Sequence, residues 1–140
     1  MTLSLFEKLT LGLAGTTALG IGTAILAAPQ EFYASYGIEI AGDASLLSEL
    51  RAPGAGLAAW GGLMLAGVWR GGLQQVAIVA ALTVFLAFPA GRVAGLLLDG
   101  TPAPGILAAL ALELAIAALL MAAFRHRLRP EGGQRRHARA

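Results

Sequence analysis

The amino-acid sequence predicts an all-α fold: an integral membrane bundle of four antiparallel helices with both termini in the cytoplasm. Of its 140 residues, 57% are hydrophobic and only 13% are charged, far from the balance of a water-soluble domain. Four apolar runs also reach the roughly 20 residues that a helix rising about 1.5 Å per residue needs to cross about 30 Å of hydrocarbon. We expect one transmembrane domain over residues 1–128 and a basic, flexible tail over residues 129–140. The expected spans are residues 5–28, 46–69, 73–98 and 102–124.

The first span is uncharged from Leu9 to Ala28 and stops before Pro29, whose ring and missing N–H discourage a continued helix. A secretory signal peptide is the competing interpretation, with Lys8 as its basic region and Ala27-Ala28 as its cleavage site. The apolar stretch is too long for such a peptide, and a proline would follow the cut. We therefore expect a retained membrane anchor.

The outer loop, residues 29–45, is the polar stretch between the first two spans. It combines acidic and aromatic side chains, as segments at a membrane surface often do: Glu31, Phe32, Tyr33, Tyr36, Glu39 and Asp43. Asp43 or Ser45 can cap the second span. Pro53 is expected to bend or restart that span, because proline cannot donate a backbone hydrogen bond.

Short turns join the remaining spans. Residues 70–72, Arg-Gly-Gly, form a tight turn, so the third helix must return beside the second. Residues 99–102, Asp-Gly-Thr-Pro, precede the fourth helix. We expect Thr101 to cap this helix and Pro102 to occupy its first position, where a missing N–H costs nothing.

The basic residues predict the orientation. If both termini are cytoplasmic, nearly all basic residues lie on the cytoplasmic side and the outer loops have no Lys or Arg. This distribution agrees with the positive-inside rule. The residues on that side are Lys8, Arg70, Arg125, Arg127, Arg129, Arg135, Arg136 and Arg139. We expect a multi-pass protein of the bacterial inner membrane.

Small residues are expected at the contacts between spans, since helices in lipid associate through close approach and polar contacts. Each span has a row of small residues at every fourth position. The glycines expected to pack are Gly12, Gly20, Gly54, Gly62, Gly91 and Gly95. Because Gly and Ala are abundant here, some of these rows are expected to arise by chance.

Five ionisable residues lie within or at the ends of the expected spans: Glu49, Arg51, Arg92, Asp99 and Glu113. Such residues usually face the protein interior and pair with one another. From the helix rise, Arg92 lies about 9 Å and Glu113 about 15 Å below the outer surface, a difference that the long arginine side chain can cover. We expect these two residues to pair and the other three to lie near them.

Two interpretations of this charged cluster remain open. It can be a polar clasp that holds the helices in register. Alternatively, it can line a cavity open to the outer side, in which Arg51 and Arg92 bind an acidic or carbonyl-bearing head group. Glu113 would then accept a proton or a hydrogen bond.

Several chemistries are not expected. The chain has no cysteine, which excludes disulfides, thiolate metal sites and iron–sulfur clusters. Its two histidines, His126 and His137, follow the last span, so neither a haem nor a zinc site is expected within the bundle. The serines lack a histidine on their side of the membrane, and the glycine-rich stretches lack the Lys-Ser/Thr of a phosphate loop. Scattered basic residues give no stripe for nucleic acid.

Short motifs recur in a recognisable order: Pro29, Phe32, Tyr33, Gly37, Glu49-Leu50-Arg51, Gly91-Arg92, Asp99-Gly100, Pro102 and Glu113. Through them the sequence resembles the family known as domain of unknown function 4345, small four-helix membrane proteins of bacteria. The resemblance spans nearly the whole chain before the tail, and Ser48 departs from it by standing where the family has Asn. The resemblance implies the architecture and a shared charged cluster. It implies no reaction, because the family has no established activity. A more distant similarity to the DoxX-like four-helix group implies quinone-linked chemistry by analogy of fold alone.

Three functional hypotheses follow. The first is a binding or accessory protein that holds a lipid, a quinone or a similar amphiphile. The second is a small proton-coupled transporter that uses Glu113, although no inverted repeat is visible. The third is an enzyme acting on a lipid or quinone, with Glu113 or Asp99 as general base and Arg51 or Arg92 stabilising negative charge, although no nucleophile stands out. A homodimer or a larger membrane complex is compatible with each hypothesis.

Overall fold

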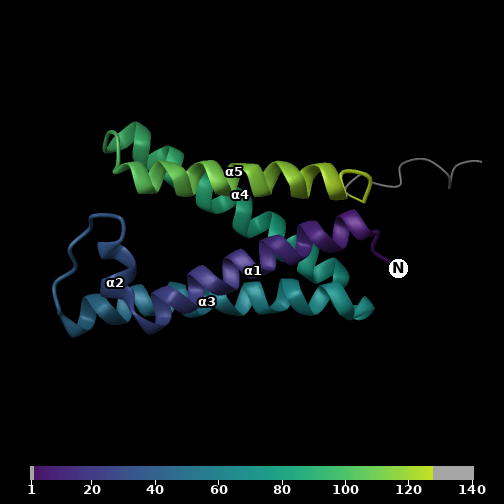
Figure 1. Ribbon diagram of the computed structural model, residues 1–140, viewed down its shortest axis with the longest axis horizontal. Helices are drawn as coiled ribbons and strands as arrows, with labels where there is room; N and C mark the ends of the chain where they lie inside the picture. Colours follow the sequence, from purple (N-terminus) through teal and green to yellow (C-terminus); the bar gives the residue numbers. More distant parts are fainter. Residues whose placement is uncertain (1, 128–140) are drawn as a thin grey trace, which may run out of the picture.

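The structure is a computed structural model that describes residues 2–127, and the predicted basic tail lies outside this range. The described residues form helices and no strands, which confirms the all-α prediction (Figure 1). The helices are α1 (Leu5–Ala27), α2 (Pro29–Ala34), α3 (Ala44–Trp69), a 3₁₀ turn (Gly71–Leu73), α4 (Gln74–Leu98) and α5 (Pro104–Phe124).

Three of these segments are long and apolar enough to cross a membrane: α1, α4 together with its preceding 3₁₀ turn, and α5. The fourth long helix, α3, has 26 residues but is not among these apolar helices. At about 1.5 Å per residue, its length of roughly 39 Å would still exceed the hydrocarbon core.

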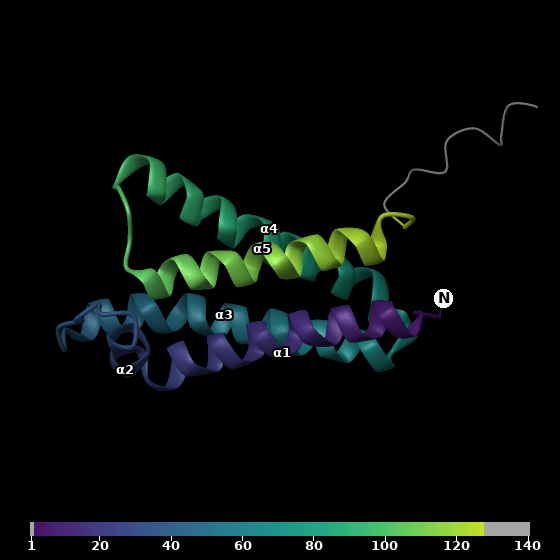
Figure 2. The same ribbon diagram turned by 45° about the horizontal axis from the view of Figure 1, so that its top comes forward.

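The four long helices lie along the long axis of the molecule (Figure 1). The connections from α1 to α3 and from α4 to α5 lie at one end, called here the loop end. The first described residues and the end of α5 lie at the other, the terminal end (Figures 1 and 2). Helix α1 packs most extensively on α3 and also lies against α5, whereas no Cα of α3 lies within 8 Å of a Cα of α5.

Local sequence explains where the helices begin. Ser4 caps α1 and forms a reciprocal capping box with Glu7, while the Asp43 side chain accepts a hydrogen bond of 2.9 Å from the Leu46 N–H at the start of α3. Asp43, rather than Ser45, is therefore the cap of this helix. The helix also continues through Pro53, so the expected restart does not occur.

The predicted start of the last helix is wrong by two residues. Helix α5 begins at Pro104, and neither Thr101 nor any other side chain caps it. The reason is that Pro104 disfavours a helical conformation for the residue before it, and Ala103 is extended with φ −54° and ψ 149°. A proline does occupy the first helical turn, but it is Pro104 and not Pro102.

The contact between α1 and α3 is built from glycines spaced seven residues apart. A Cβ added to Gly22 would lie 2.3 Å from the backbone nitrogen of Ala58, and one added to Gly61 would lie 2.3 Å from that of Leu19. Gly15 and Gly54 are similarly confined, with nearest atoms at 2.9 and 2.8 Å. We call Gly15, Gly22, Gly54 and Gly61 the glycine contact.

Only Gly54 of the six glycines expected to pack belongs to this contact. A Cβ added to Gly12, Gly20, Gly62 or Gly91 would have no atom of another helix within 4 Å. A Cβ added to Gly95 would be approached only by the side chain of Asp99. The rows of four are thus wrong for Gly12, Gly20 and Gly62, because α1 and α3 meet along a seven-residue repeat, or 3.5 residues per turn. That repeat is typical of a left-handed crossing. Gly91 and Gly95 belong to α4, and no other helix lies close to either of them.

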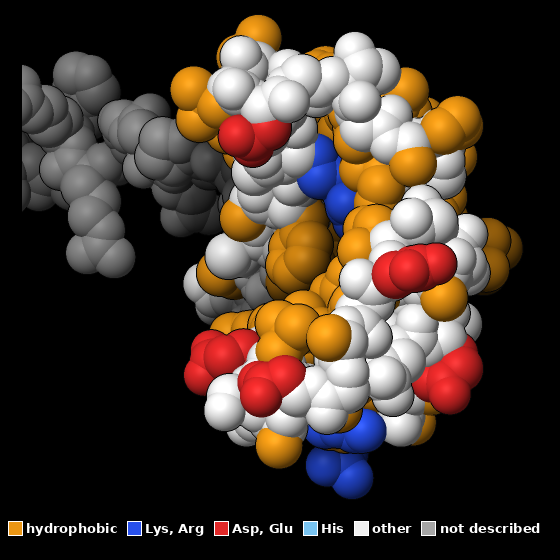
Figure 3. Space-filling model, turned by 90° about the vertical axis from the view of Figure 1, so that its left-hand side faces the viewer, with side chains coloured by type: hydrophobic (Ala, Val, Ile, Leu, Met, Phe, Trp, Pro, Cys, Tyr) orange, Lys and Arg blue, Asp and Glu red, His pale blue; other side chains and the backbone are white. Residues whose placement is uncertain are grey.

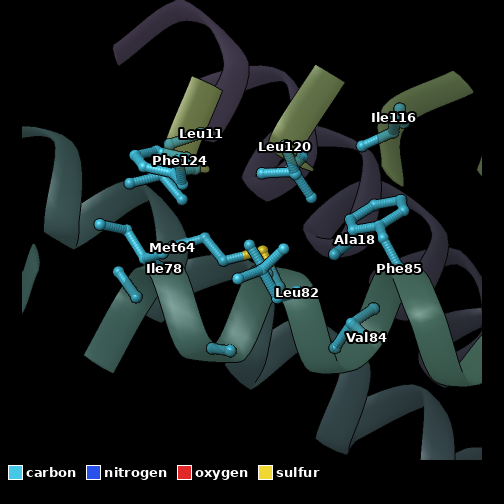
Figure 4. Packing of buried hydrophobic residues seen from close by; sticks show 14 of the residues in the cluster. Leu11, Ala18, Met64, Ile78, Leu82, Val84, Phe85, Ile116, Leu120 and Phe124 are labelled. Atoms are coloured by element: carbon cyan, nitrogen blue, oxygen red, sulfur yellow. The ribbon is translucent and has the colours of Figure 1, made fainter. Parts of the chain in front are cut away.

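The core lies between the α1–α3 pair and the two remaining helices. Figure 4 shows Leu11 of α1 beside Phe124 of α5, and Phe85 of α4 close to Ala18 of α1. All four side chains are buried. This core fills the terminal half of the molecule, and the space between the same helices opens into a cavity toward the loop end.

Candidate functional site

A cavity of about 550 Å³ lies between α1, α2, α4 and α5, and Leu57 of α3 also contributes to its lining. Its walls are mainly apolar and aromatic, with Phe32 from α2 and Phe85 and Phe88 from α4. Arg92 and Glu113 are the two charged residues among the residues that line it. Its size falls within the range of about 300 to 1,000 Å³ that is usual for small-molecule sites.

Arg92 and Glu113 form a direct ion pair across the cavity wall. The Arg92 Nε donates to both carboxylate oxygens of Glu113, at 3.0 and 2.9 Å. The Glu113 side chain is 9% exposed and that of Arg92 is 29% exposed. The structure therefore brings together the two residues that were expected to pair.

Helices α4 and α5 position the Arg92–Glu113 ion pair. Arg92 follows Pro89, a buried proline within α4. The half of α4 toward the loop end diverges from α3 in Figure 2, which leaves room beside α1 and α5. Glu113 lies midway along α5 on the face that also carries Ile116 and Ala117, both buried. The arginine thus reaches from the diverging part of α4 to the inner face of α5.

The other three predicted site residues are not part of this pair. Arg51 donates from Nη1 to the backbone oxygens of Leu26 and Ala27, the latter at 3.1 Å. These are the last carbonyls of α1, which carry the negative end of its helix dipole and attract a cation. Glu49 and Asp99 are exposed, and neither forms an ion pair within the described residues. The expected cluster of five charges is therefore reduced to two.

The aromatic residues of the segment 29–45 form a cavity wall that sequence reasoning missed. Phe32, Tyr33 and Tyr36 all line the cavity, and the Phe32 ring lies 5.3 Å from each tyrosine ring, edge to face. The Tyr36 ring also packs on Gly105, where an added Cβ would lie 2.8 Å away. The available signal is the four-residue spacing of Phe32, in α2, and Tyr36, in the turn after α2; from sequence alone these rings are expected at the membrane surface.

The surface around the cavity is acidic. Figure 3 views the loop end and shows Lys or Arg atoms inside a hollow with hydrophobic walls and Asp and Glu side chains on the surrounding surface, with a further Lys or Arg group exposed at the lower edge. The exposed carboxylates of this end belong to Glu31, Glu39, Asp43, Glu49 and Asp99. Arg51 is the other cation of this region, and it is held by the end of α1.

A second ion pair closes the terminal end. Glu7 is buried and accepts hydrogen bonds from Arg127, including one of 3.1 Å from Nη2. Arg127 Nη2 also donates to the Thr2 carbonyl at 3.2 Å, and His126 Nε2 lies 3.4 Å from the carboxylate. Hydrogen bonding to Glu7 raises the pKa of Arg127 above its ordinary value. Sequence reasoning assigned Arg127 to topology alone and did not single out Glu7.

Metal binding finds no support in the described part of the chain. No group of three or more His, Asp or Glu side chains lies close enough together there to hold a metal ion. His126 lies beside the terminal ion pair, and His137 lies outside the described residues.

Comparison with known proteins identifies one family. The model of a family described as "Domain of unknown function (DUF4345)" matches residues 6–124, which covers all of the long helices except the first residue of α1. No curated protein and no solved structure matches the chain. The family description carries no activity, so the geometry of the cavity has to suggest one.

Proposed function

Since this chain belongs to the family described as domain of unknown function 4345, whose description names no activity, we propose its function from the cavity: it binds an amphiphile, such as a lipid or a quinone, within the membrane. The observation that carries this proposal is an apolar cavity of about 550 Å³ with one ion pair in its wall. Such a site buries an apolar body and fixes one polar group, which is the usual arrangement of a small-molecule pocket.

The membrane setting of the proposal is an antiparallel bundle of four spans. Large apolar side chains are exposed on every long helix, for example Leu9, Trp60, Val79 and Leu114. Contact with lipid would explain them, whereas contact with water would be costly. We include α3 as a span because it lies alongside α1 over its length and carries charges only near the loop end (Figure 1).

The proposed orientation puts the loop end outside and the terminal end in the cytoplasm of a bacterial cell, in its inner membrane. The support is the distribution of basic residues, which favours the cytoplasmic side for Lys8, Arg70 and Arg125. The cavity then opens toward the outer half of the bilayer. A role as an accessory subunit of a larger complex is compatible with this arrangement.

The two alternative functions have weaker support. A proton carrier needs a carboxylate that can release and regain its proton, and both oxygens of Glu113 are bound by the arginine. An enzyme needs a nucleophile or base in contact with the substrate. The hydroxyl groups in the cavity lining belong to Thr17, Tyr33 and Tyr36, and none of them hydrogen-bonds to the ion pair in the described structure.

The test is native mass spectrometry of the protein purified in a mild detergent. The wild-type protein should carry a bound amphiphile. Ala109→Phe, which fills the cavity from α5, should lose it, whereas Ala118→Phe places the same side chain on an exposed part of the same helix and should retain it. A wild-type protein without any bound mass, or an equal load in Ala109→Phe, contradicts the proposal.

A further inference from the structure

The ion pair in the cavity leaves hydrogen-bond donors unused. Arginine has five N–H groups, and Arg92 spends only the one on Nε, shared between the two carboxylate oxygens. Neither Nη group donates to another of the residues 2–127. Because Arg92 lines the cavity and is 29% exposed, up to four N–H groups are available to a molecule bound there.

The same pair leaves the cavity without net charge. The guanidinium is neutralised by a carboxylate 2.9 Å away, and no other charged side chain lines the cavity. An anion bound to the free Nη groups would bring a net negative charge into an apolar site beside Glu113. An uncharged acceptor, such as a carbonyl oxygen, would satisfy the same donors without that cost.

The charges on the surface around the cavity also disfavour an anion. The exposed carboxylates of the loop end, Glu31, Glu39, Asp43, Glu49 and Asp99, give this end a negative field. The field raises the free energy of an approaching anion. A cation would be drawn to this surface, but inside the cavity it would meet Arg92, whose free donors offer it no acceptor.

From these three observations we infer that the cavity selects uncharged amphiphiles that carry a carbonyl-type hydrogen-bond acceptor, and that it rejects anionic amphiphiles of the same shape. This inference rests on the proposed binding function and decides between the two head groups that sequence reasoning left open. Arg92 supplies the donors, and Glu113 supplies the negative charge that excludes an anion. The apolar and aromatic walls hold the hydrocarbon part.

Three probes of similar length separate the chemistries: 2-tridecanone has a neutral acceptor, dodecanoate at pH 9 is an anion, and tridecane has neither. Each is titrated over the same range of mole fractions into the delipidated protein in an uncharged detergent micelle, and occupancy is read by native mass spectrometry. The ketone should reach half occupancy at a mole fraction about tenfold lower than either of the other probes, since only it satisfies the donors without adding charge.

Charge-changing variants test the assigned roles. Glu113→Gln keeps the shape but leaves Arg92 unneutralised, so the preference should move toward dodecanoate by about tenfold. Glu31→Gln makes the same chemical change at one of the five exposed carboxylates of the loop end, and it should alter the preference by less than about twofold because each exposed charge is screened and four of the five remain. Arg92→Gln removes the charged donors, and ketone binding should fall toward that of tridecane.

The outcomes separate the two proposals. If wild-type protein binds dodecanoate as well as the ketone, or if all three probes show equal occupancy, the inferred selectivity is wrong even when a native amphiphile copurifies. If in addition no amphiphile copurifies, the binding function itself fails. A lipid ester and a quinone share the inferred chemistry, and the mass and ultraviolet spectrum of the copurified molecule distinguish these sources.

Discussion

Gly22 and Gly61 have no room for a side chain. A side chain at either position would collide with the backbone of the facing helix, at 2.3 Å in each case. Backbone atoms cannot rotate away as a flexible side chain can. Any substitution therefore has to separate α1 from α3, which would weaken the most extensive helix contact in the molecule.

We expect Gly22→Ala or Gly61→Ala to lower the free energy of unfolding by about 1 to 3 kcal/mol, the usual cost of overpacking. Gly20→Ala and Gly62→Ala are matched controls on the same helices, because an added methyl group there meets no atom within 4 Å. They should be neutral or stabilising by up to about 1 kcal/mol, since alanine favours a helix more than glycine does. Thermal or denaturant unfolding in detergent measures all four. Equal losses in both pairs would contradict this assignment of the glycine contact.

Residue identity alone could not have located that contact. Glycines and alanines occur at many four-residue and seven-residue spacings in this chain, and both patterns suit helices in lipid. The choice depends on the angle at which the helices cross, which is a property of the pair. The Arg92–Glu113 contact was predictable for a different reason: each charge is costly alone at its depth, and few partners are within reach.

At the scale of elements, the terminal ion pair joins the start of α1 to the turn after α5. Glu7 belongs to the first turn of α1, where it also completes the capping box with Ser4. Arg127 lies in the turn after α5 and reaches both Glu7 and the Thr2 carbonyl. One carboxylate thus completes the cap of α1 and also holds the turn after α5 against the start of α1.

We expect Glu7→Gln to reduce the free energy of unfolding by about 1.5 to 3 kcal/mol, the range for hydrogen bonds to charged groups. Arg127→Gln should cost a similar amount, and the double variant should cost less than the sum of the two, because each single variant strands the other partner. Lys8→Gln is the control, since Lys8 is exposed and belongs to the same turn as Glu7. Strict additivity of the two single losses would show that the residues do not act as a pair.

The elements themselves were largely predictable, and their partners were not. Long apolar runs bounded by proline and glycine predict the ends of the long helices to within two residues at the starts of α3 and α5, and to within one residue at the end of α1 and the start of α4. Arg51 shows why the contacts of the helices were harder to predict than the helices themselves. Its depth suggested membership of the charged cluster, but the free carbonyls at the end of α1 lie within its reach and satisfy it. Such a choice depends on three-dimensional neighbours that periodicity does not encode.

At the scale of the whole molecule, the proposed membrane topology depends on whether α3 crosses the bilayer. The chain has no cysteine, so single cysteines report their location without background. Ala41 and Gly72 flank α3 and are both exposed, and Thr101 is exposed in the connection from α4 to α5. If all four long helices cross the membrane, Ala41 and Thr101 lie on one side and Gly72 lies on the other.

We expect Ala41→Cys and Thr101→Cys to react with a membrane-impermeant maleimide in intact spheroplasts, and Gly72→Cys to react only after the cells are lysed. Added cysteines at these sites should leave the fold unchanged, because none of the three wild-type side chains makes a described hydrogen bond, and Gly72 has open space around it. Equal labelling of Ala41→Cys and Gly72→Cys in intact cells would mean that α3 does not cross the membrane.

The glycine contact also has a consequence for how the protein is made. Helix α1 leaves the ribosome well before α3, its main partner, so its glycine face has to wait in the insertion machinery or in lipid until α3 arrives. The α1–α3 pair can then assemble while α4 and α5 are still being synthesised. Arg127 follows α5, so its bond to Glu7 can form only after all four long helices have been synthesised. Newly made chains that stop before this residue should remain open at the terminal end.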